Sequence, residues 1–305
     1  MSGTTAAPTG RQFTIRGGGS EAVITELAAA LRLYRRNGID LAQPFGEDEL
    51  PPSGSGILLA PWGNRIRDGR WELDGRTQQL DVTEVATGNA IHGLLRNTGY
   101  RLDASSESLI CLSAEIFPQH GFPFRMTHTV TYALDAEGGL SVTQDLLNHS
   151  ARSAPAALGA HPYLRLGEVP TEELVLGVQA DTALVTDERL IPTGSTPVAG
   201  DTDLRAGRRV GDLRIDIGLT GLTLHDDGVH HHRLTAPDGR AVGVWADAGF
   251  EYVQVFVTEG YAGQALAVAI EPMTAPANAF NSGEGLTWLA QHEHLIGRWG
   301  IESWL

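Results

Sequence analysis

Short stretches with β-strand character, separated by turn-forming residues, occupy almost the whole chain. The first are residues 12–16, 21–26 and 29–34, which are punctuated by Gly17-Gly18-Gly19-Ser20 and by Asn37-Gly38. Asn-Gly is typical of a hairpin because both residues accept the positive φ angles of a two-residue turn. Further strands are predicted at 109–116, 124–134, 140–147, 173–179, 251–257 and 266–270, and on either side of Pro237-Asp238-Gly239.

Another hairpin is predicted at Asp74-Gly75, between 71–73 and 76–80. Helix signals are scarce, and the best candidate is a short segment at 286–291. Many short strands without alternating helices favour an antiparallel sandwich or barrel over a sheet of βαβ units. We therefore expect an all-β protein with very little helix.

The chain has 305 residues, which allows two domains, although large all-β domains often exceed about 200 residues. No Pro/Ser-rich linker divides the sequence, and the polar segment 200–209 fits a surface loop as well as a boundary. We expect a single domain over 11–305 after a flexible N-terminal segment, 1–10.

The formal net charge of −15 favours solubility and argues against nucleic acid or an anionic membrane as a partner. No stretch approaches the roughly 18 apolar residues of a membrane span. The single cysteine, Cys111, cannot form an internal disulfide and is expected to be a buried, inert thiol. We expect a cytoplasmic protein that is a monomer or a homodimer.

Glu271 stands at the end of the apolar run 266–270, where a buried strand is expected to meet a rigid loop. Pro272 restricts Glu271 to extended backbone and removes one amide donor. A carboxylate partly removed from water has a pKa above about 4.3, as a general base near neutral pH requires. An exposed glutamate is the alternative, favoured about two to one when Glu271 is taken alone.

Most of the eleven histidines are expected to be bystanders. Residues 230–232 are all histidine and are interpreted as a solvated turn, because three consecutive residues of a strand cannot face one metal ion. His292 and His294 are expected to lie on one face of a strand. Since the sequence contains neither CxxC nor HExxH, we predict no metal site.

Two other histidines have informative neighbours. His161 precedes Pro162, which restricts its backbone and so fixes the direction of the imidazole. His92 precedes Gly93, which would let a ligand or another strand approach closely. A buried structural histidine bonded to backbone carbonyls is an equally good interpretation of each.

Polar residues follow the apolar run 57–60 directly. Arginine donors suit either sugar oxygens or a phosphate. Arg65, next to Asn64, is expected to point into a cleft, whereas Arg67 and Arg70 fit surface ion pairs about as well as contacts with such a ligand. The sequence contains no glycine-rich nucleotide loop.

Five motifs together resemble the aldose 1-epimerase (galactose mutarotase-like) family. They are Asn64-Arg65-Ile66, Asn89-Ala90-Ile91-His92-Gly93, His161-Pro162-Tyr163, Glu271-Pro272-Met273 and Asn278-Ala279-Phe280, and they fall in family order between residues 64 and 285. The resemblance implies a large antiparallel β-sandwich with an active cleft on the open face of one sheet. It also implies an isomerase that acts on a small-molecule sugar without a cofactor.

The resemblance implies a role for individual residues. Glu271 matches the family's catalytic base, and His161 matches its general acid. Arg65, with Asn64 beside it, and His92 match residues that hold the sugar near the ring oxygen and hydroxyls.

Two further matches and two departures concern the sugar. Asp216 resembles the family's sugar-binding aspartate, and Gln254 resembles a further polar contact. His92 is followed by Gly93-Leu94 where many members have two glycines, and His161 is followed by proline rather than serine. These departures leave the identity of the sugar open.

The residue types suit interconversion of the anomers of a free aldohexose such as glucose or galactose. The reaction removes the proton of the C1 hydroxyl and protonates the ring oxygen, and a carboxylate with an imidazolium supplies both transfers. A hexose-6-phosphate 1-epimerase is an alternative, because Arg96 follows His92 by four residues and, with Arg65, Arg67 and Arg70, could bind a phosphate. Two further alternatives are a non-catalytic sugar-binding module and a lyase or glycosidase.

Overall fold

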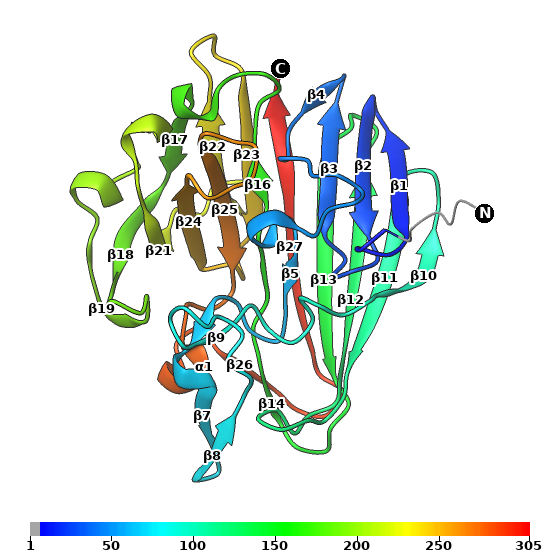
Figure 1. Cartoon of the computed structure of the whole chain (residues 1–305), viewed down its shortest axis with the longest axis vertical. Coiled ribbons are helices and arrows are strands. Elements are labelled where there is room, and N and C mark those ends of the chain that lie inside the picture. Colours follow the sequence, from blue (N-terminus) through cyan, green and yellow to red (C-terminus); the bar gives the residue numbers. More distant parts are fainter. Residues whose placement is uncertain (1–6) are drawn as a thin grey trace.

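A computed structural model describes residues 7–305, and antiparallel sheets dominate it (Figure 1). The largest sheet has nine strands. In spatial order they are β10 (Arg101–Ser105), β11 (Leu109–Ile116), β12 (Met126–Leu134), β13 (Leu140–Asn148), β27 (His294–Trp304), β23 (Ala241–Asp247), β22 (Val229–Thr235), β17 (Val175–Val178) and β20 (Arg208–Arg209). Buried and half-buried residues alternate along β12 and β13, so one face of this sheet packs on the core.

A second sheet has eight strands and contains Glu271. They are β19 (Pro192–Pro197), β18 (Ala180–Thr186), β21 (Asp216–Leu222), β24 (Tyr252–Thr258), β25 (Ala267–Met273), β15 (Gly159–Ala160) and β5 (Leu58–Leu59), with β16 (Tyr163–Leu164) also paired to β25. Every residue of β25 is buried, which means that both faces of this strand are covered.

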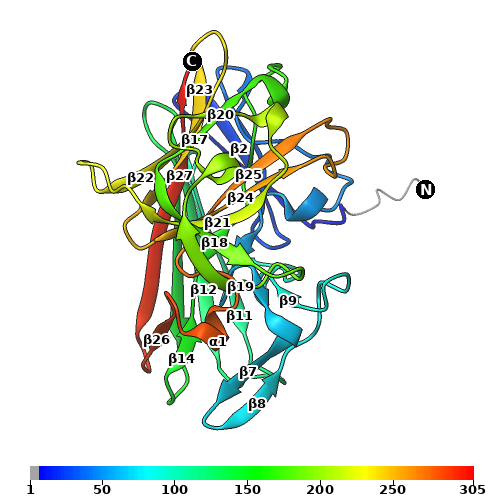
Figure 2. The ribbon, with the colours of Figure 1, turned by 90° about the vertical axis from the view of Figure 1, so that its left-hand side faces the viewer.

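A third sheet consists of β1 (Gln12–Gly17), β2 (Ser20–Thr25), β3 (Leu31–Arg36) and β4 (Ile39–Asp40). It lies against the β10–β13 half of the large sheet, where the Tyr132 hydroxyl donates to the Ala29 carbonyl at 2.7 Å. The eight-stranded sheet lies against the other half (Figures 1 and 2). The protein is therefore an all-β sandwich, as predicted, with one large sheet facing two smaller ones.

Short elements close one end of the sandwich (Figure 2). They are the pairs β6 (Arg65–Ile66) with β9 (Ala90–Ile91), β7 (Arg70–Leu73) with β8 (Arg76–Gln79), and β14 (Ala154–Ala156) with β26 (Thr287–Leu289), together with α1 (Ala279–Ser282). Five single-turn 3-10 helices are η1 (Pro52–Gly54), η2 (Arg67–Gly69), η3 (Thr171–Glu173), η4 (Gly200–Thr202) and η5 (Val210–Asp212).

One local prediction is confirmed and another is wrong. The hairpin at Asp74-Gly75 is confirmed, and both residues have positive φ angles, 51° and 71°. The helix predicted at 286–291 is wrong, because Thr287–Leu289 pairs with β14 as a strand. The α-helix of the described chain lies earlier, between the left-handed residues Asn278 and Gly283.

Several other predictions concern the ends and the surface. Of the predicted flexible segment 1–10, residues 1–6 lie outside the described residues, and Gly10 donates its amide to the Ala7 carbonyl at 2.9 Å. Cys111 is half-buried rather than buried, because it occupies one of the less covered alternate positions of β11. Within residues 7–305, no helix is long and apolar enough to cross a membrane.

Candidate functional site

The register of β25 brings Glu271 and His161 together. Tyr163 of β16 lies opposite Ala269 of β25. Because antiparallel strands pair in opposite order, His161, two residues before Tyr163, lies opposite Glu271, two residues after Ala269. The His161 Nε2 and the Glu271 Oε1 are 3.4 Å apart, and both side chains are at most 5% exposed.

This position of Glu271 corrects one prediction. The strand does not give way to a loop at Glu271 but continues to Met273, with Pro272 opposite Val253. Proline fits there because its fixed φ is compatible with extended backbone. The carboxylate therefore emerges from a buried central strand rather than from a strand end.

The neighbouring strands of the same sheet extend this polar surface. Gln254 of β24 lies opposite Glu271, and Asp216 of β21 lies opposite Phe256. Residues two apart on a strand share a face, so all four side chains lie on the side of the sheet that carries Glu271. The Gln254 side-chain amide donates to Asp216, which orients this carboxylate.

The opposite side of the site comes from β6 and β9, where Arg65 pairs with Ile91. Their neighbours Asn64 and His92 have left-handed φ angles of 53° and 64°, and the His92 amide donates to the Asn64 carbonyl at 2.9 Å. Left-handed non-glycine residues cost free energy and are frequent at functional sites. We call Asn64, Arg65, Glu84, Ile91 and His92 the Arg65 side of the site.

Gly93 lets this segment lie directly on the chain at Ala60, as its position after His92 suggested. Its φ is 74°, and a Cβ atom there would be 2.1 Å from the Ala60 carbonyl oxygen. We expect Gly93→Ala to lower the free energy of unfolding by on the order of 3 kcal/mol, measured by urea denaturation, through left-handed strain and overlap. The matched control Gly75→Ala has a similar φ of 71° but open space around it. Equal losses for the two variants would refute this role of Gly93.

The two sides enclose a cavity of about 230 Å³, small enough to suit a compact polar ligand. Its lining residues are Ser53, Asn64, Arg65, Glu84, Ile91, His92, His161, Asp216, Phe256 and Glu271. Three buried atoms of its lining residues, Glu271 Oε2, His161 Nδ1 and His92 Nδ1, have no hydrogen-bond partner among residues 7–305. Unpaired buried polar atoms are uncommon in native proteins, so they mark these three residues as candidates for contact with a polar ligand.

Arg65 is held by two carboxylates. Its Nε and one terminal nitrogen each donate to Glu84 at 2.8 Å, and its other terminal nitrogen is 3.5 Å from Asp216. Burial lowers the pKa of Arg65, but the Glu84 hydrogen bond and the Asp216 charge outweigh burial and raise it. The guanidinium is thus a fixed positive group whose bidentate partner sets its orientation.

Burial has opposite effects on the two groups of the acid–base pair. It raises the pKa of Glu271 well above its usual range, and the nearby charge of Asp216 adds to this while Arg65 opposes it. Burial lowers the pKa of His161 to about 4, and the positive charges of Arg65 and Arg96 act in the same direction. Both shifts favour the uncharged forms.

Six of the seven predicted site residues line the cavity. They are Glu271, His161, Arg65, His92, Asp216 and Asn64, whereas Gln254 contacts the site through Asp216. Arg67 forms a surface ion pair with Asp187 at 2.6 Å, and Arg70 is exposed and bonds to Gln79. Arg67 and Arg70 thus take the surface alternative for their side chains.

The histidine-rich segments differ from their interpretation. Residues 230–232 are not a solvated turn but belong to β22, where His230 and His232 are buried and His231 is half-buried. His231 bonds to Asp227 and Glu302 at 2.8 and 2.7 Å. His292 lies in a turn and does not share a strand face with His294. Within residues 7–305, no group of histidine, cysteine or acidic residues could hold a metal ion.

Sequence reasoning missed four lining residues, Glu84, Ser53, Ile91 and Phe256, although Ile91 lies within one of the motifs of the resemblance. Glu84 lies in an exposed-looking polar stretch, and only its pairing with Arg65 distinguishes it from a surface acid. Phe256 could have been found, because it follows the predicted contact Gln254 by two residues in a strand and therefore shares its face.

The site and the fold define a large β-sandwich protein with a buried carboxylate–imidazole pair in a small polar cavity. A family model described as aldose 1-epimerase matches residues 11–298. The chain belongs to the aldose 1-epimerase family.

The chain is similar to two curated proteins in sequence and to one solved structure in fold. Uncharacterized protein YihR of Escherichia coli is 31% identical over 281 residues, covering 92% of this chain and 89% of that one. Galactose mutarotase of Homo sapiens is 27% identical over 176 residues, covering 54% of this chain and 49% of that one. The crystal structure of the GalM/aldose epimerase homologue from C. elegans has a TM-score of 0.84 at 18% identity, covering 96% of this chain and 98% of that one.

Proposed function

We propose that this protein is an aldose 1-epimerase that interconverts the α and β anomers of a free aldohexose such as glucose or galactose. The observation that carries this proposal is the 3.4 Å approach of the buried His161 and Glu271 inside a polar cavity. Burying two ionisable groups costs free energy, and a module that only bound sugar would have no need of a matched acid and base.

In the proposed reaction, one group of the pair accepts the proton of the C1 hydroxyl while the other donates a proton to the ring oxygen. The C1–O5 bond breaks and C1 becomes an aldehyde carbon. Rotation about C1–C2 and reclosure through the reverse proton transfers give the other anomer. Each transfer by a positioned side chain contributes roughly 10²- to 10⁴-fold.

Glu271 and His161 together carry one titrating proton in the proposed reaction. This proton is on the imidazole in the carboxylate–imidazolium form and on the carboxyl group in the form with a neutral imidazole. From the carboxylate–imidazolium form, Glu271 acts as base and His161 as acid in ring opening, and the two exchange roles when the ring closes. The opposite pKa shifts of the two groups keep the singly protonated pair over a wide pH range.

Arg65 has a supporting role. Its guanidinium is charged at all relevant pH values and is fixed by Glu84 and Asp216. A fixed positive group beside the sugar stabilises negative charge that develops on oxygen as the ring opens. We propose that His92, Asn64, Asp216 and, through Asp216, Gln254 orient the sugar hydroxyls.

The pH dependence of kcat/KM tests the singly protonated pair. Below about pH 4, His161 is protonated as well as Glu271, so the pair carries two protons and no base remains. Activity therefore falls on the acid side of the profile. On the alkaline side, activity falls as the raised pKa of Glu271 is passed, because no acid remains. We expect full activity well below the ordinary histidine value of 6.5, measured by polarimetry. An acid limb at 6.5 would contradict the assignment.

One observation favours the hexose-6-phosphate alternative. Arg96 is half-buried, forms no ion pair among residues 7–305, and is close enough to lower the pKa of both His92 and His161. The other arginines of the predicted cluster do not form a phosphate site with Arg96, since Arg65 is paired with Glu84 and Arg67 with Asp187. We therefore prefer a free sugar.

A panel of substrates separates the two functions. Anomer exchange is measured by NMR for glucose, galactose and glucose-6-phosphate. The proposal expects exchange of at least one free hexose at a rate above that of the phosphate ester. A strong preference for the phosphate ester would replace the proposal with the alternative, and exchange of none of the three would remove both.

A further inference from the structure

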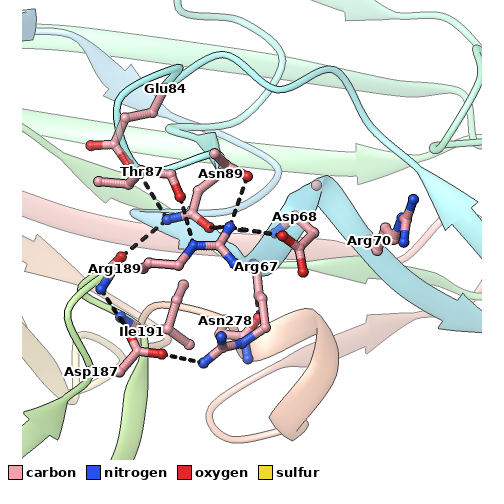
Figure 3. Close-up of polar contacts among 12 residues, drawn as sticks. Arg67, Asp68, Arg70, Glu84, Thr87, Asn89, Asp187, Arg189, Ile191 and Asn278 are labelled. Carbon is pink, nitrogen blue, oxygen red and sulfur yellow. Dashed lines mark hydrogen bonds and ion pairs between the residues drawn. The ribbon is translucent and has the colours of Figure 1, made fainter.

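A hairpin turn from a distant part of the chain contacts the back of the Arg65 side. This turn joins β18 to β19, and Asp187 shapes it by accepting the amides of Arg189 and Ile191, both at 3.0 Å. Figure 3 shows the Arg189 side chain of this turn reaching into the loop that carries Glu84, Thr87 and Asn89.

Arg189 bonds to four groups. Its Nε donates to the Thr87 carbonyl at 2.7 Å, and one terminal nitrogen donates to Asp68 at 2.8 Å and to Gly88 and Asn89 at 3.1 Å (Figure 3). The side-chain amide of Asn89 in turn donates to the Arg189 backbone carbonyl at 3.1 Å. The Arg189 side chain is 28% exposed, and besides its ion pair with Asp68 it donates to two backbone carbonyls, those of Thr87 and Gly88, so its contacts fix the conformation of this loop.

The loop that Arg189 contacts also contacts Glu84, the carboxylate partner of Arg65. The Thr87 hydroxyl donates to the Glu84 carboxylate, and the amides of Gly88 and Asn89 donate to the Glu84 carbonyl at 2.9 and 3.2 Å. The same carboxylate receives the two hydrogen bonds of Arg65. A continuous chain of contacts thus runs from Arg189 through the loop to the cavity.

A second contact fixes the hairpin turn to the same region. Arg67, two residues after Arg65, pairs with Asp187 at 2.6 Å. The Arg67 amide donates to the Asn278 side chain at 3.1 Å (Figure 3). The Asn278 backbone amide donates to the Arg65 carbonyl. The backbone of Arg65 and its carboxylate partner are therefore both held against this turn.

We propose that Arg189 is a positioning residue, which fixes the Glu84 loop and thereby the direction of the Arg65 guanidinium in the cavity. This inference rests on the proposed function for its activity readout. Since misplacement of a catalytic or binding group by about 1 Å can cost about 10²-fold, Arg189→Ala is expected to lower kcat/KM by roughly 10- to 100-fold. Arg189→Lys keeps the charge but cannot span four acceptors, so it should recover little of this loss.

The matched control is Arg205→Ala. Arg205 follows the same hairpin, bridges Asp203 and Asp181 at 2.8 and 3.2 Å, and does not line the cavity. It should keep wild-type kcat/KM. Arg189→Ala is then combined with Glu84→Gln. If Arg189 acts through Glu84, the double variant is no worse than Glu84→Gln alone, whereas independent effects multiply and would overturn the proposal.

Hydrogen exchange of the empty proteins reads the same coupling without turnover. Arg189→Ala should speed exchange of the Gly88 and Asn89 amides, and Arg205→Ala should not. Unchanged hydrogen exchange in Arg189→Ala overturns the proposal, and so does faster hydrogen exchange combined with wild-type kcat/KM. If the wild-type protein does not interconvert sugar anomers, the proposed function fails, while faster hydrogen exchange in Arg189→Ala still supports the positioning of the loop.

Discussion

Glu271→Gln is expected to lower kcat for anomer exchange by roughly 10²- to 10⁴-fold, because an amide of nearly the same shape can neither accept nor release the proton of the C1 hydroxyl. KM should change far less, since the glutamine can still hydrogen-bond to the sugar. The measurement is polarimetry of a freshly dissolved pure anomer, with a correction for the uncatalysed reaction.

The same substitution is expected to stabilise the fold. Burial raises the Glu271 pKa above its ordinary value of 4.5, so its contribution to stability is fully present below pH 4.5 and is lost as the pH rises through the raised pKa. The gain in Tm of Glu271→Gln over wild type should therefore increase with pH. His161 titrates in both proteins and affects this difference less.

Glu251→Gln is the matched control for both effects, since Glu251 is exposed next to the start of β24. It should leave kcat and Tm unchanged at every pH. Wild-type turnover by Glu271→Gln would remove the catalytic assignment of Glu271, and a gain in Tm that shrinks with pH would show that its carboxylate is not destabilised by burial.

His161→Asn is expected to cause a loss of kcat of similar size, roughly 10²- to 10⁴-fold, because asparagine carries no group that titrates. Its amide lacks the reach of the imidazole toward Glu271, which lies 3.4 Å from Nε2 in the wild-type protein. The acid limb of the pH–rate profile near pH 4 should disappear from the remaining activity. Anomer exchange measured by NMR as a function of pH gives both results.

His294→Asn is the control for a histidine paired with a carboxylate elsewhere, since His294 bonds to Asp145 on the surface of the large sheet at 2.7 Å. It should turn over like wild type. If His161→Asn stayed folded and kept both its rate and its acid limb, the proton donor of the proposed reaction would have to be another group.

The fold was predictable where local chemistry decides it. Alternation of apolar residues gave strands such as β11 and β12, and Asp74-Gly75 gave its hairpin, because both patterns depend on neighbouring residues alone. Segment 230–232 was misread for the same reason. Its polarity suggested a turn, whereas its burial in β22 depends on strands that come from elsewhere in the chain.

The site was predictable only in part. Glu271 and His161 could be singled out by their proline neighbours and by resemblance, but their contact depends on the pairing of β25 with β15 and β16. Glu84 and Arg189 carry no distinguishing sequence pattern. Their importance arises from tertiary contacts, such as that between Arg189 and Asn89, which are 100 residues apart in the sequence.

The most direct measurement is a crystal structure of Glu271→Gln soaked with the hexose that the wild-type protein turns over. The account predicts a pyranose in the cavity between the Arg65 side and β25, with its C1 hydroxyl within hydrogen-bond distance of residue 271 and its ring oxygen within that distance of the His161 Nε2. A sugar bound with C1 turned away from residue 271, or outside this cavity, would contradict it.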